Sequence, residues 1–209
     1  MIAQGEVPEL LKKLRRYFAF TSLFSMEETG LRVTYERDKR VTQLCKKEGI
    51  VWTESPTNGV ARGLQNREGW RKYWYEAMNA PQETFSAKAS DFVSADTVAL
   101  WQQCLPQFKP KFSTEVPFQR GGETLAHEVF QDFLAHRAKN YNKFISKPRQ
   151  SRESCSRLSP YLAWGNLSIR QAYQGAAQVR KAGQFKSALS SFQSRLRWHC
   201  HFIQKFEME

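Results

Sequence analysis

The segment from Ser156 to Gly165 combines residue types that bind anions with a pattern typical of a helix start. Ser159 has the side chain of an N-cap and Pro160 suits the first helical position, so a helix with free backbone N–H groups is expected to begin here. The helix dipole favours an anion at that point, and Ser156 and Arg157 add a hydroxyl donor and a forked cation. The pattern indicates a phosphate site. Taken alone, it is better explained by a capped helix whose apolar residues face a core.

The composition fits one or two folded domains. The chain has 209 residues, of which 41% are hydrophobic and 13% aromatic, enough for a sizeable core. No apolar run approaches the roughly 18 residues that cross a bilayer, and residues 1–14 lack a secretory signal. We therefore expect a cytoplasmic protein without a membrane segment. No metal site is expected, because the cysteines are widely spaced and His199 and His201 do not share a helix face.

Charge is distributed unevenly along the chain, whose formal net charge is +12. Residues 133–206 contain 14 Lys and Arg but one acidic residue, Glu153, whereas the rest of the chain is nearly neutral. Such an excess, interleaved with aromatic residues, is typical of a surface that binds a phosphate backbone, so DNA is an expected partner. The alternative is a set of basic helix surfaces that only keep the protein in solution.

Hydrophobic periodicity predicts helices and strands in alternation over the first 80 residues. A helix is expected over 8–18, a strand over 20–24, a second helix over 33–47 ended by Gly49, and a strand from residue 50. This alternation predicts a parallel sheet. A further helix over 67–78 carries Trp and Tyr residues that we expect to pack in a core.

The second part of the chain is expected to be all-helical. Periodicity is weak and proline recurs between residues 80 and 120, which is typical of a linker. Helical spacing then resumes after Gly121 and continues over 172–182 and 185–206. We therefore place an α/β domain at 1–80, an interdomain linker at 81–120 and a helical domain at 121–209.

Several short motifs resemble, in type and order, those of the photolyase/cryptochrome family. In the helical part they are Gly-Gly-Glu-Thr at 121–124, Ser-Arg-Leu-Ser-Pro-Tyr-Leu at 156–162 and Arg-Leu-Arg-Trp at 195–198. Upstream they are Glu-Thr-Gly at 28–30, Tyr-Glu-Arg-Asp at 35–38 and Asn-Arg-Glu-Gly-Trp at 66–70. The resemblance implies the C-terminal half of a Rossmann-like parallel α/β domain followed by the start of an all-helical FAD-binding domain. Relative to the family the chain looks truncated at both ends, so a chain supplying the missing parts is a possible partner.

The resemblance also implies the cofactor and its contacts. In the family, FAD phosphates meet the residues that correspond to Ser156, Arg157, Leu158 and Ser159, and an aromatic residue corresponding to Tyr141 lies nearby. Cys155 takes a place where relatives often carry threonine. An antenna chromophore is a second cofactor of the family, and the sequence leaves open whether one binds here.

A later helix carries the residues that the resemblance places at the flavin and the substrate. Phe192, Arg195 and Trp198 are spaced three apart, so they are expected to share a face that looks into the flavin pocket. Trp198 matches a tryptophan that lines the cavity for a flipped-out pyrimidine dimer, and we take it as the catalytic candidate. The alternative is a tryptophan buried in a core. His199 stands where many relatives have a cofactor-contacting arginine, and an imidazole lacks the forked N–H donors of a guanidinium.

The function implied is that of a blue-light-driven deoxyribodipyrimidine photolyase, a DNA repair lyase that uses electron transfer from reduced FAD. Arg195 departs from this pattern, because repairing members carry a glutamate there that accepts a hydrogen bond from the damaged base, and a cation cannot accept one. Arg195 could instead attract cofactor phosphates or a nucleic-acid backbone. Two alternatives therefore stay open: a cryptochrome-like flavin receptor without repair activity, and an inactive fragment that keeps only nucleic-acid binding.

Overall fold

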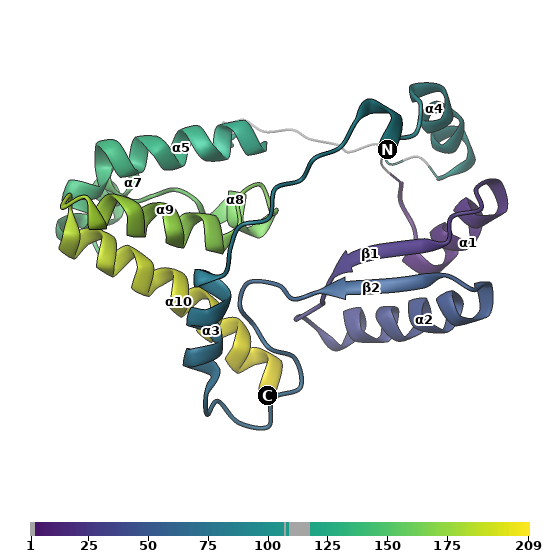
Figure 1. The fold of residues 1–209 in the computed structure, drawn as a ribbon, viewed down its shortest axis with the longest axis horizontal. Coiled ribbons are helices and arrows are strands. Elements are labelled where there is room, and N and C mark those ends of the chain that lie inside the picture. The colour runs from purple at the N-terminus through teal and green to yellow at the C-terminus, as the bar shows by residue number, and fades with distance from the viewer. Residues whose placement is uncertain (1–2, 107, 109–117) are drawn as a thin grey trace. The chain divides into compact units, whose positions relative to one another are not determined.

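The computed structural model describes residues 3–106, 108 and 118–209, and the chain divides into two compact units (Figure 1). Unit 1 contains Met1–Thr57 and Glu83–Ser113, and unit 2 contains Asn58–Gln82 and Thr114–Glu209. Each unit is thus built from two separate stretches of sequence. Within the described residues, no helix combines the length and the apolar character needed to cross a membrane.

Unit 1 is an α/β unit around a two-stranded parallel sheet. Its elements are α1 (Val7–Tyr17), β1 (Ser22–Met26), α2 (Arg32–Glu48), β2 (Val51–Ser55), the 3-10 helix η1 (Ala89–Asp91) and α4 (Ala95–Cys104). In the sheet Ser22 pairs with Val51 and Met26 with Ser55. Because α2 connects two neighbouring parallel strands, it is the crossover helix that a parallel pair requires. The predicted parallel sheet is confirmed.

The end of α2 shows why the sequence pattern located this element well. Gly49 has φ +66°, a left-handed conformation that glycine adopts without a steric penalty, and its N–H donates to the carbonyl oxygen of Cys45. The chain then turns into β2. A small core of Val41, Cys45 and Ile50 lies beneath the sheet and is covered in part by Leu11 of α1.

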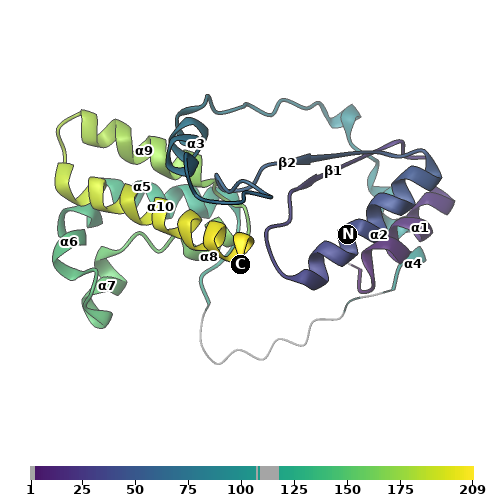
Figure 2. The same ribbon diagram turned by 90° about the horizontal axis from the view of Figure 1, so that it is seen from below.

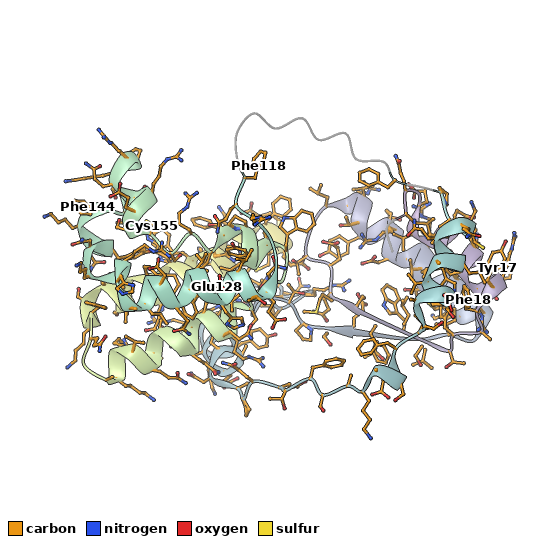
Figure 3. The ribbon with its side chains drawn as sticks, turned by 90° about the horizontal axis from the view of Figure 1, so that it is seen from above. Tyr17, Phe18, Phe118, Glu128, Phe144 and Cys155 are labelled. Carbon is orange, nitrogen blue, oxygen red and sulfur yellow. The ribbon has the colours of Figure 1, made fainter. Side chains whose placement is uncertain are left out.

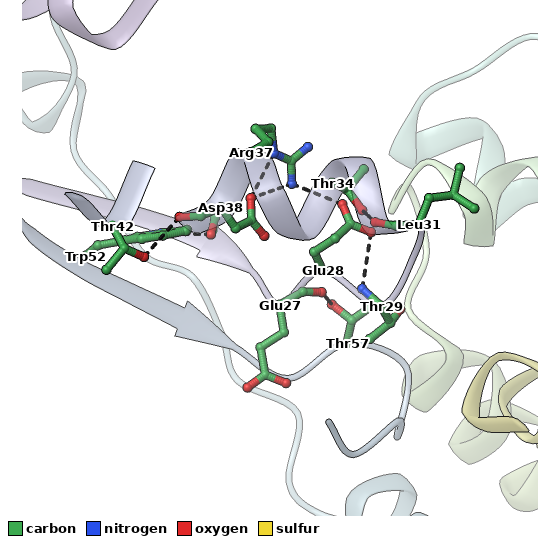
Figure 4. A network of polar contacts seen from close by, with 11 residues as sticks. Glu27, Glu28, Thr29, Leu31, Thr34, Arg37, Asp38, Thr42, Trp52 and Thr57 are labelled. Atoms are coloured by element: carbon green, nitrogen blue, oxygen red, sulfur yellow. Dashed lines mark hydrogen bonds and ion pairs between the residues drawn. The ribbon is translucent and has the colours of Figure 1, made fainter. Parts of the chain in front are cut away.

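A polar network joins the end of β1 to α2 (Figure 4). The Arg37 guanidinium lies 3.1 Å from a carboxylate oxygen of Glu28 and 2.7 Å from one of Asp38. Glu28 also accepts a hydrogen bond from the backbone N–H of Thr29. Since Asp38 is 8% exposed, the cation compensates a buried carboxylate and fixes how the chain leaves the sheet.

The weakly periodic stretch between residues 80 and 120 contains a helix that the sequence pattern does not predict. In α4, the Ser94 hydroxyl accepts from the Thr97 N–H at 3.2 Å, which is an N-cap. The Trp101 ring then packs 4.0 Å from that of Phe18, between centroids, so α4 is part of unit 1. Residues 107 and 109–117 of the expected linker lie outside the described residues.

Helices form all the regular structure described in unit 2. They are α3 (Trp70–Asn79), α5 (Glu123–Ala135), η2 (Arg137–Asn140), α6 (Tyr141–Phe144), α7 (Pro148–Ser154), α8 (Ser159–Ala163), α9 (Ile169–Lys181) and α10 (Lys186–Met208). Helix α9 packs against α3, α5 and α10 (Figure 2). The side chains of Trp74, Phe133 and Leu189 are fully buried in one continuous core. The expected all-helical second part is observed.

Helix α3 lies in unit 2, although the sequence boundary places residues 58–80 with the α/β part. The Arg170 guanidinium of α9 donates to the carbonyl oxygens of Ala77 and Pro81 at 2.7 and 3.1 Å. The Gln174 side chain donates to the carbonyl oxygen of Met78 at 2.8 Å. The bonds to Ala77 and Met78 satisfy C-terminal carbonyls of α3, so α9 holds the end of that helix.

The segment before α3 is fastened to α10. The fully buried Gln204 amide accepts from the Ala61 N–H at 2.7 Å and donates to the Ala61 carbonyl at 2.9 Å. One turn earlier, the Cys200 thiol donates to the carbonyl oxygen of Asn58, and burial raises the pKa of this thiol to about 11. Residues 58–82 are therefore an integral part of the helical unit.

Candidate functional site

Backbone conformation makes an anion-binding concavity at residues 157–159. Arg157 has φ +59°, which is left-handed, and Leu158 that follows is right-handed with φ −87° and ψ −12°. When one residue is left-handed and its neighbour right-handed, their successive backbone N–H groups point to the same side. This arrangement is called a nest, and it binds anions. Within the described part of the chain, the N–H groups of Arg157, Leu158 and Ser159 have no backbone acceptor. A left-handed backbone conformation is unfavourable by about 1–2 kcal/mol for a residue such as arginine, so the rest of the fold must hold Arg157 in it.

The side chains beside this nest are polar and accessible. Ser156 is half-buried, whereas Arg157 and Ser159 are exposed. Among the described residues Arg157 has no ion pair. Two hydroxyls and one free guanidinium therefore surround three free N–H groups, a donor set that suits phosphate oxygens.

The helix expected to begin at this segment differs from the prediction in two respects. The N-cap is Leu158, with no side-chain cap, so Ser159 is the first helical residue and Pro160 the second. The predicted N-cap role of Ser159 is wrong, because the left-handed turn at Arg157 starts α8 one residue earlier than the Ser-Pro pattern suggests. With only five residues, α8 contributes a weak dipole. The nest, rather than the helix, is the anion-binding feature.

Three of the expected cofactor residues lie in the core of unit 2. Leu158 is 1% exposed, Tyr141 5% and Phe192 3%. The Tyr141 ring centroid lies 6.0 Å from that of Phe192, with the rings nearly perpendicular, and burial raises the pKa of Tyr141 to about 12. Phe192 thus packs among core rings of α5 and α6, whereas Arg195 and Trp198 of the same helix are exposed, and its predicted contact with the flavin stays a prediction.

Farther along α10, the expected residues are accessible. Trp198 is 48% exposed, which removes the alternative of a buried core tryptophan. The Arg195 guanidinium lies 5.1 Å from the centroid of the Trp198 ring, within cation–π range. Partial burial lowers the pKa of His199, so this side chain is a neutral donor or acceptor near pH 7.

Trp198 belongs to a basic and aromatic pocket of about 680 Å³, the α10 pocket. Its lining includes Arg67, Arg71, Arg197, Trp198, His201 and Phe202, and contains no carboxylate. The Arg197 guanidinium bonds to the hydroxyl of Tyr75, and that of Arg67 lies 3.1 Å from His201 Nε2. Partial burial, reinforced by the charges of Arg67, Lys205 and Arg197, lowers the pKa of His201.

Arg157 lines a different pocket, of about 770 Å³, which we call the α8 pocket. Arg152, Trp164 and Phe118 also line it, and it shares no residue with the α10 pocket. The predicted site residues thus lie in three places. Ser156, Arg157 and Ser159 are at the nest, Tyr141, Leu158 and Phe192 are in the core, and Arg195, Trp198 and His199 are on the exposed part of α10. Sequence reasoning missed Arg152, Phe118, Arg67 and Arg71 as site residues, and the only signal for them was their basic or aromatic character.

The helical unit with its nest, together with the parallel α/β unit, defines a photolyase/cryptochrome-like fold. The cryptochrome of Synechocystis sp. PCC6803 has a similar structure, with a TM-score of 0.65 and 15% sequence identity over 100% of this chain and 46% of that protein. A class III photolyase from Agrobacterium tumefaciens has a TM-score of 0.60 and 17% identity over 97% of this chain and 44% of that one. The chain therefore spans less than half the length of either protein. No protein-family model and no curated protein matches this sequence.

Proposed function

We propose that this chain binds FAD at residues 156–159 and contributes to a blue-light-driven photolyase that repairs pyrimidine dimers in DNA. The observation that carries the proposal is the nest at Arg157 and Leu158, flanked by the hydroxyls of Ser156 and Ser159. The photolyase/cryptochrome-like fold supports it.

The residues at the nest fit the diphosphate of FAD. Its oxygens need several N–H donors and a cation, and the nest offers both without a competing carboxylate partner for Arg157. The buried Leu158 side chain anchors the segment in the core that also contains Tyr141. Bound flavin would supply light absorption and electron transfer. The chain's own residues bind the phosphates and keep the segment rigid.

The α10 pocket supports DNA as the substrate. Arg67, Arg71 and Arg197 present three cations that could face backbone phosphates, while the half-exposed Trp198 offers a ring on which an unpaired base can stack. Because such binding releases counterions, its affinity should fall steeply as salt rises.

The test of the cofactor is flavin retention. After FAD is added and the excess removed, the wild-type chain should keep visible flavin absorption, and Arg157→Ala should lower it because one phosphate-facing cation is lost. Arg149→Ala, an exposed arginine of α7 outside both pockets, is the matched control. A colourless wild-type protein, or equal retention in all three proteins, contradicts this assignment.

The second candidate function is a cryptochrome-like receptor that binds flavin without repairing DNA. The Arg195 guanidinium over Trp198 favours it, because a cation beside the stacking ring cannot accept a hydrogen bond from a damaged base. Blue-light illumination of flavin-loaded protein with dimer-containing DNA separates the two. Loss of dimers identifies the lyase, and unchanged dimers with retained flavin identify the receptor.

A further inference from the structure

The α8 pocket is a second basic and aromatic site, and its wall is fixed by hydrogen bonds. Gln119 donates through Nε2 to the carbonyl oxygen of Arg157 at 2.9 Å, and the Tyr161 hydroxyl donates to the carbonyl oxygen of Arg120 at 2.8 Å. These two bonds hold residues 119–120 against α8. The pocket is therefore preformed, and its volume of about 770 Å³ is within the usual range for small-ligand sites.

Two cations line this pocket without neutralising partners. Arg152 extends from α7 and Arg157 from the nest, and both are exposed. Neither has an ion pair among the described residues, and the pocket lining contains no carboxylate. A free guanidinium is a planar fork of donors that matches two phosphate oxygens. This pair of arginines therefore favours a phosphate-bearing ligand.

Two aromatic side chains of the same lining are left open. Trp164, just after α8, is 83% exposed, and Phe118 is 76% exposed. Phe118 lies on the segment that leads to α5 (Figure 3). Gly122 of the same lining also borders open space, because a Cβ there would meet no atom within 4 Å. Exposed rings beside unpaired cations are the combination that binds single-stranded nucleic acid, in which bases stack on rings and phosphates meet cations.

We propose that the α8 pocket binds one nucleotide unit of a single-stranded nucleic acid, with its base on Trp164 and its phosphates at Arg152 and Arg157. The proposal shares the DNA partner of the proposed function but does not require flavin. Arg157 belongs to both proposals, because the same guanidinium stands beside the nest and lines the pocket, so its loss does not distinguish them. Arg152 and Trp164 lie outside the cofactor segment, so they distinguish the two proposals.

The experiment is a titration of the full chain against a fluorescently labelled ten-residue oligothymidylate at several salt concentrations. Trp164→Ala should weaken binding about 5- to 160-fold, the range of one lost base stack. Arg152→Ala should weaken it several-fold and reduce the slope of log affinity against log salt by about 0.7, the value for one phosphate contact on a single strand.

Matched controls make the result specific. Arg149→Ala removes an exposed arginine from the same helix, and Phe85→Ala removes an 87% exposed ring from unit 1. Both should bind like wild type. Circular dichroism checks the fold of each variant. If Trp164→Ala binds within twofold of Phe85→Ala, or an abasic oligomer binds as tightly as oligothymidylate, the proposal is overturned.

Two further measurements complete the test. Competition by thymidine monophosphate identifies a site that accepts free nucleotides, whereas competition only by oligomers assigns the pocket to a strand. Flavin retention is measured on the same variants. Since Arg152→Ala and Trp164→Ala should retain flavin as the wild type does, loss of oligomer binding with flavin unchanged supports this site. A wild-type chain that takes up no flavin contradicts only the proposed function.

Discussion

Units 1 and 2 use their basic side chains in different ways. In unit 1 two arginines are paired with carboxylates: Arg37 with Glu28 and Asp38, and Arg40 with Glu6 at 2.6 Å. In the two pockets of unit 2, arginines contact rings, hydroxyls or solvent, and no carboxylate lines either pocket. The comparison shows that an arginine paired with carboxylates stabilises the fold, as Arg37 does in unit 1, whereas the arginines of the two pockets leave positive potential for an anionic partner.

The cores of the two units differ in extent. Three buried residues, Val41, Cys45 and Ile50, form the core described for unit 1. Unit 2 has a continuous core that runs from Val60 to Cys200 and includes residues from seven of its helices, η2 among them. Because buried apolar area is the main stabilising contribution, unit 2 should resist unfolding more strongly than unit 1.

The largest expected effect is on the unit 2 core. Trp74→Ala should lower the free energy of unfolding by about 3–5 kcal/mol, because it empties a fully buried site. Denaturant titration followed by hydrogen exchange in α9 and α10 measures it. Val41→Ala should lower the stability of unit 1 by about 1–3 kcal/mol and leave those amides protected. Equal loss of protection in both variants would show that the units unfold as one.

Gln204→Leu should lower the stability of unit 2 by about 2–4 kcal/mol. The substitution leaves both the N–H and the carbonyl of Ala61 without their buried partner. Thermal unfolding measures the change, and Gln178→Leu on the exposed side of α9 is the control. A Gln204→Leu variant as stable as the control would mean that water replaces the amide.

Arg37→Ala should lower the stability of unit 1 by about 1–3 kcal/mol, since it leaves the buried Asp38 carboxylate without its cation. Lys181→Ala, an exposed residue at the end of α9, should change stability by less than about 0.5 kcal/mol. Chemical denaturation of the two variants tests the contrast between the units directly. A similar loss of stability in both variants would contradict this contrast between the units.

The smallest effect is a dependence of unit 2 stability on pH. The pKa of His201 is lowered in the folded state, so below about pH 6.5, the usual pKa of histidine, the unfolded chain binds more protons. Stability should therefore fall as the pH is lowered from 7 to 5. Melting temperatures across this range should show a shallower decline for His201→Gln than for wild type. An unchanged decline, with His136→Gln as control, contradicts the role of His201.

Local signals predicted the elements of unit 1 well and their partners poorly. The helix ended by Gly49 and the two strands follow from periodicity and capping, which act within a few residues. Helix α4 was missed because its apolar residues are partly exposed, although Ser94 is an N-cap signal. The place of α3 depends on Arg170 and Gln174, about 90 residues away, and no local pattern contains that information.

The candidate site was predictable in part for the same reason. Serines and an arginine at 156–159 can be recognised in the sequence, but the nest depends on the φ of Arg157, which a non-glycine residue rarely adopts. Whether Phe192 and Trp198 face inward or outward depends on which helices cover α10. The convergence of Arg67 with Arg197 requires the packing of residues 58–82 onto α10.

The attachment of residues 58–82 to α9 and α10 makes the helical unit discontinuous in sequence. Gln204, Arg170 and Gln174 hold this stretch by side-chain bonds to its backbone, so its retention does not rely on chain connectivity alone. If the backbone is nicked between residues 83 and 94, unit 2 becomes a noncovalent complex of two fragments, and its stability then depends on their concentration. A peptide of residues 58–82 is thus the natural complement of the remaining helices.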